Sequence, residues 1–181
     1  MKLKDERLKI YEVDGHYLEY LCSFDKNVRL KSDRKYTGIL VSDNNVDYCI
    51  PLTSKVKKRS PKLTVNIKDK DKTISQLTIN NMIPVSENIV HIVDISHEKH
   101  IDYLNKEIMF LRKKHNINSL IEKTENVFKV LNNPNNKDYI FFRRLCADYS
   151  LLEEKCKEYI QKQYDDTEKQ LVEEDEYEIT I

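Results

Sequence analysis

Two basic segments of the chain combine hydroxyl and cationic side chains in a pattern that suits the binding of a phosphodiester. Residues Lys31–Gly38 read KSDRKYTG, and residues Pro51–Ser60 read PLTSKVKKRS. Lysine and arginine form charge-assisted hydrogen bonds with phosphate oxygens, and serine and threonine hydroxyls can position the same atoms. A lysine-rich loop beside a hairpin is more often a solvated face, so the spacing alone leaves both interpretations open.

RNA is a phosphodiester that can be cleaved without a metal ion, because its own 2′-hydroxyl attacks the adjacent phosphorus. An enzyme must then remove a proton from that hydroxyl, stabilise the charged transition state and protonate the leaving 5′-oxygen. Lysine and arginine supply the electrostatic stabilisation, and lysine or tyrosine transfers protons when its pKa is tuned. Such a site needs no histidine, no glycine-rich loop and no cofactor.

A short hairpin positions the two basic segments next to each other. Tyr36–Ser42 and Val46–Leu52 are predicted strands, and the turn between them is Asp43–Asn45. Because the strands are antiparallel neighbours, their open ends lie side by side. The residues predicted to meet there are Arg34, Lys35, Tyr36, Thr53, Ser54, Lys55 and Lys57.

The rest of the chain predicts an α+β fold around this hairpin. Further strands are expected at Leu8–Val13, Leu63–Ile67, Thr73–Ile79 and Ile89–Ile95. Helices are expected at His16–Phe24 (capped by Asp14), Ser96–His115, from Asn118 or Ser119 onward, Phe141–Cys146 and Leu151–Tyr164. Strands followed by helices favour a twisted antiparallel sheet or partial barrel with helices packed on it. We predict a single domain over residues 1–165, followed by an acidic tail, residues 166–181.

The charges are segregated, although the 181-residue chain has a formal net charge of zero. Lys26–Lys72 contains thirteen basic and five acidic residues, a net charge of +8, whereas Ser150–Ile181 contains four basic and eleven acidic residues, a net charge of −7. The neutral total therefore conceals a basic region suited to a polyanion.

Several classes of function and location are disfavoured by composition. Only two glycines are present, Gly15 and Gly38, so neither a G-x-G-x-x-G nor a Walker A motif exists. The N-terminus is charged and no apolar run could span a bilayer, so we expect a cytoplasmic protein with no membrane contact. The four cysteines show no C-x-x-C spacing, which favours reduced and mostly buried thiols. His97 and His100 lack further ligands at a zinc-like spacing, so no metal site is predicted.

A family resemblance extends along most of the chain. The segments that carry it are the D-x-x-V run from Asp25 to Val28, YTGI (36–39), YCIPLTS (48–54), NNMIPV (80–85), YLNKEIMFL (103–111) and LLEEKC (151–156). Their order and spacing, from about Leu8 to Tyr159, resemble the ToxN/AbiQ family of type III toxin–antitoxin endoribonucleases.

The resemblance implies a fold similar to that of the MazF and CcdB toxins. It also implies metal-independent RNA cleavage that leaves a 2′,3′-cyclic phosphate and a 5′-hydroxyl. Members are inhibited by a small repeated RNA that folds as a pseudoknot, assemble with it into RNA-bridged rings or other oligomers, and act in abortive infection against phage.

The resemblance also assigns roles to individual residues. Thr53 and Ser54 match the family's Thr-Ser pair and are expected to contact the scissile phosphate. Arg34 falls where members carry a basic residue, and Tyr36 where an aromatic residue precedes the G-I strand. The family's catalytic lysine lies two residues after the serine, which here is Val56. Its neighbours Lys55 and Lys57 are the candidates, with Lys55 preferred.

Other basic side chains are expected to bind the RNA substrate or the RNA inhibitor along the same groove: Lys31, Lys35, Lys58, Arg59, Lys62, Arg143 and Arg144. Phe141 and Phe142 could stack on bases, but burial in the core is the favoured interpretation for both. Two other hypotheses stay open at this point, a non-catalytic toxin of the CcdB type and a plain RNA-binding module.

Overall fold

The structure is a computed structural model. It describes the chain except for residues 5–7, 29–35, 44, 59, 99 and 179–181 and the side chains of residues 36, 37, 97 and 166–178. The strands are β1 (Lys2–Leu3), β2 (Tyr11–Val13), β3 (Tyr36–Asp43), β4 (Val46–Thr53), β5 (Thr64–Asp69), β6 (Lys72–Thr78), β7 (Ile83–Val85) and β8 (Val90–Ile92). The α-helices are α1 (Gly15–Cys22), α2 (Ile101–Leu111), α3 (Lys114–Leu131), α4 (Tyr139–Leu145) and α5 (Tyr149–Glu178), and single 3-10 turns are η1 (Ile79–Asn81), η2 (Glu87–Ile89) and η3 (Ile95–His97).

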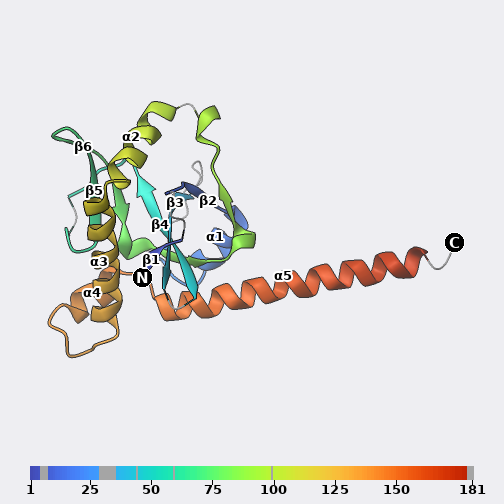
Figure 1. The fold of residues 1–181 in the computed structure, drawn as a ribbon. Coiled ribbons are helices and arrows are strands. Elements are labelled where there is room, and N and C mark those ends of the chain that lie inside the picture. Colours follow the sequence, from blue (N-terminus) through green and yellow to red (C-terminus); the bar gives the residue numbers. More distant parts are fainter. Residues whose placement is uncertain (5–7, 29–35, 44, 59, 99, 179–181) are drawn as a thin grey trace.

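The strands form one antiparallel sheet that twists but does not close. Its order is β5-β6-β4-β3-β2-β8, with β1 beside β3 and β7 beside β4. Helices α3 and α4 lie along one side of the sheet, and α5 leaves the body as a long arm (Figure 1). This arrangement confirms the predicted α+β fold with an open, twisted antiparallel sheet.

Both predicted hairpins are confirmed. In the first, Leu40 pairs with Cys49 across β3 and β4, and Asn45 in the turn has a φ of 68°, a left-handed conformation that asparagine tolerates. In the second, Val65 pairs with Leu77 across β5 and β6. Alternation of apolar and polar residues was therefore sufficient to locate the strands that build the centre of the sheet.

The first helix starts as predicted. The Asp14 carboxylate accepts a hydrogen bond from the Tyr17 backbone N–H at 2.9 Å, which caps α1. The helix then buries Tyr17, Leu18 and Leu21. Its apolar face thus packs into the core, as the helical spacing of these residues predicts.

The prediction of one helix over Ser96–His115 is wrong. Asp94, not Ser96, caps the short turn η3, and α2 begins only at Ile101. Helix α2 ends at Leu111, and α3 begins at Lys114, earlier than predicted. The Asn116 side chain donates to the Phe110 carbonyl at 2.7 Å, so the break between the helices is stabilised by a side-chain bond rather than by glycine or proline.

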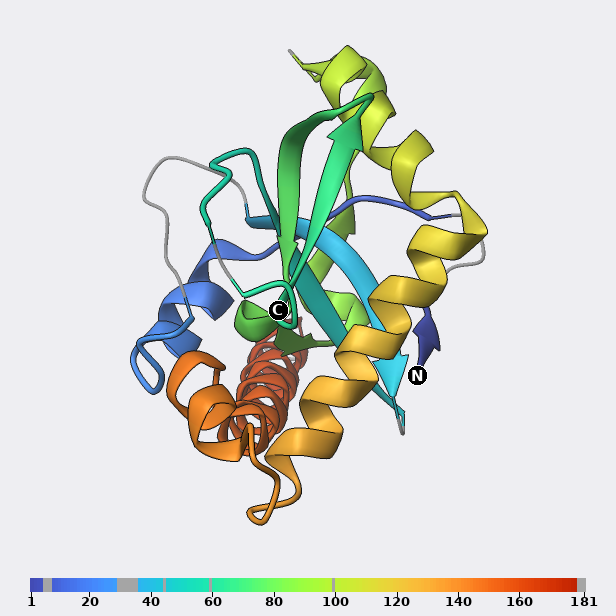
Figure 2. The ribbon, with the colours of Figure 1, turned by 90° about the vertical axis from the view of Figure 1, so that its left-hand side faces the viewer.

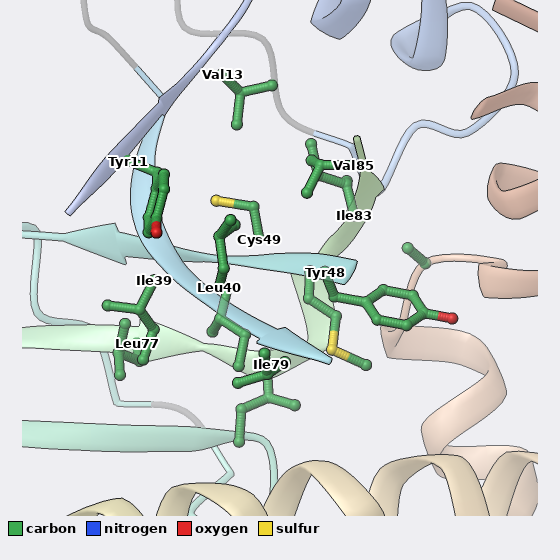
Figure 3. Close-up of a cluster of buried hydrophobic side chains, with 14 of the residues drawn as sticks. Tyr11, Val13, Ile39, Leu40, Tyr48, Cys49, Leu77, Ile79, Ile83 and Val85 are labelled. Atoms are coloured by element: carbon green, nitrogen blue, oxygen red, sulfur yellow. The ribbon is translucent and has the colours of Figure 1, made fainter. Parts of the chain in front are cut away.

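The core is shared by several strands. Figure 3 shows side chains of β2, β3, β4, β6 and β7 meeting in one apolar cluster, among them Tyr11, Ile39, Cys49 and Leu77. All four cysteines are free thiols, and three of them are buried, as predicted. Within the described part of the chain, no helix is long and apolar enough to cross a membrane.

Candidate nucleic-acid interface

The candidate site lies where β4 ends, between two other strands. β4 pairs with β3 as far as Pro51, which faces Gly38. Its last residues pair with β6 instead, Leu52 with Leu77 and Thr53 with Gln76. The predicted pairing of β3 with β4 is therefore confirmed as far as Gly38 and Pro51, and beyond this point β6 takes the place of β3 beside β4.

Gly38 permits the close approach of β3 and β4 at this point. A Cβ added to Gly38 would lie 2.2 Å from the Ile50 carbonyl oxygen and 2.8 Å from the Cys49 sulfur. A contact of 2.2 Å with backbone cannot be relieved by a side-chain rotation. The glycine of the YTGI segment thus serves packing beneath the site.

The backbone that follows β4 is folded back on itself. The Thr53 hydroxyl oxygen accepts from the Lys55 N–H at 3.2 Å, and the Val56 N–H donates to the Ser54 carbonyl at 3.0 Å. Two consecutive short-range bonds therefore set the path of the chain past Ser54. The hydroxyl proton of Thr53 stays available for a phosphate oxygen.

Gln76 anchors this segment from inside the protein. Its side chain is only 2% exposed. Its carbonyl accepts from the Lys57 N–H at 3.0 Å, and its amide nitrogen donates to the Lys57 carbonyl at 2.9 Å and to the Asn66 side chain at 2.8 Å. The Gln76 amide therefore replaces a strand partner for Lys57. Sequence reasoning missed this residue, because nothing local distinguishes it from other strand glutamines.

The functional side chains of the segment point outward. Ser54, Lys55, Lys57 and Lys58 are exposed, and these lysines form no ion pair within the described part of the chain. A fixed backbone thus presents three uncompensated cations beside two hydroxyls, which attracts an anionic ligand.

Several predicted site residues cannot be placed. Lys31, Arg34, Lys35 and Arg59 lie outside the described residues. The backbone of Tyr36 pairs with Val13 on β2, but its side chain is likewise outside the description.

Two of the other predicted cations are already paired. Lys62 lies 2.6 Å from the Asp138 carboxylate at the start of α4. Arg143 lies 2.5 Å from the Asp148 carboxylate, which holds the pKa of Asp148 below its ordinary value. Arg144 is exposed and forms no ion pair within the described residues.

The junction between α4 and α5 is held by side chains from the turn after α1 and from η1. The Asn80 side chain donates to the Leu145 carbonyl at 3.1 Å, and the Asn27 side chain donates to the Cys146 carbonyl at 3.1 Å. Asn81 in turn donates to the Asn27 carbonyl at 2.7 Å. These residues belong to the D-x-x-V and NNMIPV segments, so the two segments act as structural connectors.

The two phenylalanines of α4 differ in environment. Phe142 is fully buried, as expected, whereas Phe141 is 44% exposed, so the expectation of burial is wrong for Phe141. The helix has one core face, and these neighbours lie about 100° apart around its axis. Only Phe141 is therefore available to a ligand.

The geometry is suited to holding a phosphodiester. Serine and threonine hydroxyls stand beside lysines on an anchored turn, and the described residues contain no group of three or more histidine, cysteine, aspartate or glutamate side chains arranged for a metal ion. Hydroxyls and cations of this kind can orient a phosphate and stabilise its developing charge.

Comparison with known proteins gives consistent matches. The family model described as toxin ToxN of type III toxin–antitoxin systems matches residues 9–157. The chain is 35% identical to the endoribonuclease ToxN of Bacillus thuringiensis subsp. kurstaki, over 83% of this chain and 84% of the relative. It is 29% identical to the endoribonuclease AbiQ of Lactococcus lactis subsp. lactis, over 86% and 91%. A solved structure of a bacterial type III toxin–antitoxin system, concerned with selective toxin inhibition by a non-coding RNA pseudoknot, has a TM-score of 0.76 at 32% identity and covers 85% of this chain and 98% of its own.

Proposed function

The chain belongs to the family of ToxN toxins of type III toxin–antitoxin systems, and from this premise we propose that it cleaves RNA at the surface where β4 ends. The named relatives ToxN and AbiQ are endoribonucleases, and the chain covers 84% and 91% of their lengths, so it is an endoribonuclease. The domain that carries this activity is residues 1–165, with the acidic residues 166–181 outside it.

The cleavage uses the 2′-hydroxyl of the RNA as its nucleophile. As the 2′-hydroxyl loses its proton, its oxygen bonds to the adjacent phosphorus. The bond from phosphorus to the 5′-oxygen breaks and that oxygen takes up a proton, so the products carry a 2′,3′-cyclic phosphate and a 5′-hydroxyl. Ser54 and Thr53 donate hydrogen bonds to the scissile phosphate, and Lys55 stabilises its charge in the transition state. Arg34 and Tyr36 are assigned to the same site.

The observation that carries this proposal is the exposed Ser54 with its flanking lysines on an anchored backbone. Lys55 is our assignment for the catalytic lysine because it directly follows Ser54. Lys57 is the alternative, and its backbone is held by Gln76 through two hydrogen bonds. The other cations that we assign to RNA binding, Lys31, Lys35, Lys58, Arg59, Lys62, Arg143 and Arg144, bind the RNA backbone.

An RNA antitoxin controls this activity. A solved relative at 32% identity concerns toxin inhibition by a non-coding RNA pseudoknot, and a structured RNA of this kind would cover the same cations as the substrate. Pseudoknot repeats then bridge copies of the chain into an RNA–protein oligomer. The role of the pair is abortive infection against phage, and cleavage of cellular or phage RNA requires a cytoplasmic location.

The decisive test is cleavage of an A-rich RNA in EDTA by the purified wild type and by Ser54→Ala, Lys55→Ala and Lys57→Ala. We expect cyclic-phosphate products from the wild type. We expect a loss of roughly 100- to 1,000-fold in Ser54→Ala and in one lysine variant, as when one transition-state donor is removed. Lys114→Ala, an exposed lysine at the start of α3, is the matched control and should cleave normally.

The alternatives predict different results. A non-catalytic toxin of the CcdB type would leave RNA intact and remain toxic with Ser54 and Lys55 replaced. A plain RNA-binding module would bind RNA with strong salt dependence but would not cleave it. Intact RNA with a well-folded wild type would overturn the nuclease assignment of the site.

A further inference from the structure

Helix α4 exposes apolar side chains to which the proposed mechanism gives no role. Ile140 is 80% exposed, Phe141 44% and Leu145 37%. Arg144 is also exposed, and because residues four apart lie one above the other on a helix, Arg144 lies next to Ile140 and Leu145 next to Phe141. The buried Phe142 holds the opposite side of α4 in the core. We call the outer side, Ile140, Phe141, Arg144 and Leu145, the α4 platform.

The C-terminal end of the platform adjoins the end of β4. The Leu145 carbonyl accepts from Asn80, which lies two residues after Thr78. The Thr78 hydroxyl donates to the Pro51 carbonyl at 3.3 Å, two residues before Thr53. A short chain of contacts thus joins the platform to the strand that carries the proposed site.

The N-terminal end of α4 adjoins the segment that follows the site. The ion pair between Lys62 and Asp138 joins the chain two residues after the second basic segment to the residue before α4. Figure 2 shows α4 below the segment that connects β4 and β5, on the same side of the molecule. Both ends of α4 are therefore linked by contacts to the strand and the segment that carry the proposed site.

The chemistry of the platform fits unpaired nucleotides. A phenyl ring can stack on any base, and an arginine beside it can bind the neighbouring phosphate. No carboxylate belongs to this face of α4. An apolar protein partner would need only the aliphatic residues, whereas the combination with Arg144 and the adjoining lysines favours a polyanion with exposed aromatic faces.

We propose that the α4 platform is an RNA-binding surface, on which an unpaired base stacks against Phe141 while Arg144 binds an adjacent phosphate. The inference rests on the proposed function in taking RNA as the ligand. It adds a binding site for single-stranded nucleotides next to the scissile position, and it assigns Phe141 a role in recognition.

The test measures binding of a fluorescent, A-rich 2′-O-methyl RNA, which lacks the attacking hydroxyl and cannot be cleaved. We expect Phe141→Ala to raise Kd roughly 5- to 100-fold, the range for loss of one stacked base. Phe141→Tyr, which keeps an aromatic face, should bind as the wild type does. Met109→Ala on α2, whose side chain is 68% exposed, is the matched control and should leave Kd unchanged.

The salt dependence separates stacking from charge. Arg144→Ala should reduce the slope of log Kd against log salt concentration by about 0.7, the value for one phosphate contact on a single strand. Phe141→Ala should weaken binding at every salt concentration without changing the slope.

An RNA affinity of Phe141→Ala equal to that of the wild type would overturn the inference. An altered oligomeric mass of the same variant would then identify the platform as a protein interface. If the wild type itself fails to bind or cleave RNA, the proposed function fails as well. If the wild type cleaves RNA normally and Phe141→Ala binds RNA as tightly as the wild type, only the proposed role of the α4 platform is rejected.

Discussion

The two faces of strand β6 differ in how their buried polar side chains are hydrogen-bonded. Ser75 and Gln76 are neighbours, so their side chains point to opposite sides of the sheet, and both are buried. On one side the Gln76 amide uses both its oxygen and its nitrogen in hydrogen bonds. On the other, the Ser75 hydroxyl lies beside the carboxyl of Glu107 on α2, and Glu107 Oε2 has no hydrogen-bond partner among the described residues.

The difference shows where buried polarity serves the site and where it lowers stability. Gln76 holds the backbone of Lys57, so its burial is compensated by the bonds that shape the site. Glu107 is 2% exposed, and burial raises its pKa to about 7. Burial of this carboxyl therefore opposes folding whenever it must ionise.

The largest expected effect is that of Glu107→Gln on stability. Below pH 4.5 the carboxyl is protonated in both states, so the variant should match the wild type. Between pH 4.5 and about 7 only the unfolded chain ionises, so the wild type loses stability as the pH rises. At pH 8 the variant should be more stable by up to about 3 kcal/mol.

Urea unfolding at pH 4 and pH 8 measures this difference. Glu122→Gln, which changes an exposed glutamate of α3, is the matched control and should show no such pH dependence. An equal gain at both pH values would mean that ionisation of Glu107 does not limit stability.

A smaller change in stability, in this case a loss, is expected from Gln76→Leu, together with a specific loss of activity. Leucine keeps the volume but leaves the Lys57 N–H and carbonyl without their partner, which costs about 2 kcal/mol. We expect cleavage to fall by roughly 10-fold, mainly through kcat, because the turn after Ser54 loses its fixed position.

The assay should be run where both proteins are fully folded, so that stability alone cannot explain a change in rate. Gln161→Leu on α5 removes an exposed glutamine bonded to Asp165 at 2.8 Å and serves as the control. Unchanged kcat in Gln76→Leu would show that the hydrogen bonds between Gln76 and Lys57 stabilise the fold without positioning the site.

The smallest effect is expected from Ser75→Ala. At pH 4 the neighbouring Glu107 carboxyl is uncharged, so removal of this buried hydroxyl should change the free energy of unfolding by no more than about 1 kcal/mol. The hydroxyl of Ser75 partly offsets the effect of burial on Glu107, so the pKa of Glu107 should rise further in the variant. NMR titration of Glu107 checks this shift, and a fall in its pKa would contradict the account.

The features that were predicted correctly are those that depend on residues close together in the sequence. The two hairpins and the cap at Asp14 follow from alternation and from a single side chain. Strand β7 was not predicted, because three residues are too few to show alternation. The break between α2 and α3 was missed because it depends on Asn116 bonding to Phe110 rather than on a helix-breaking residue.

The site divides in the same way. The Thr-Ser-Lys run could be recognised in the sequence, because hydroxyl and ammonium side chains are typical of phosphate binding. The hydrogen bonds between Gln76 and Lys57 could not be predicted, because these residues are nineteen positions apart and meet only through the β4–β6 pairing. The exposure of Phe141 was also hidden, because two adjacent phenylalanines do not reveal which of them faces the core.

The long helix α5 has a consequence for the shape of the particle in solution. The thirty residues of α5 measure about 45 Å. The Tyr164 hydroxyl accepts a hydrogen bond from the Asn88 side chain at 3.2 Å. The part of α5 that follows Tyr164 extends about 20 Å further as a rod. A compact body of this size has a radius of gyration of about 15 Å. The arm therefore increases friction much more than mass, so a lone chain elutes early from a sizing column and sediments slowly. Counting subunits by elution volume would overestimate them, whereas light scattering would give the true number.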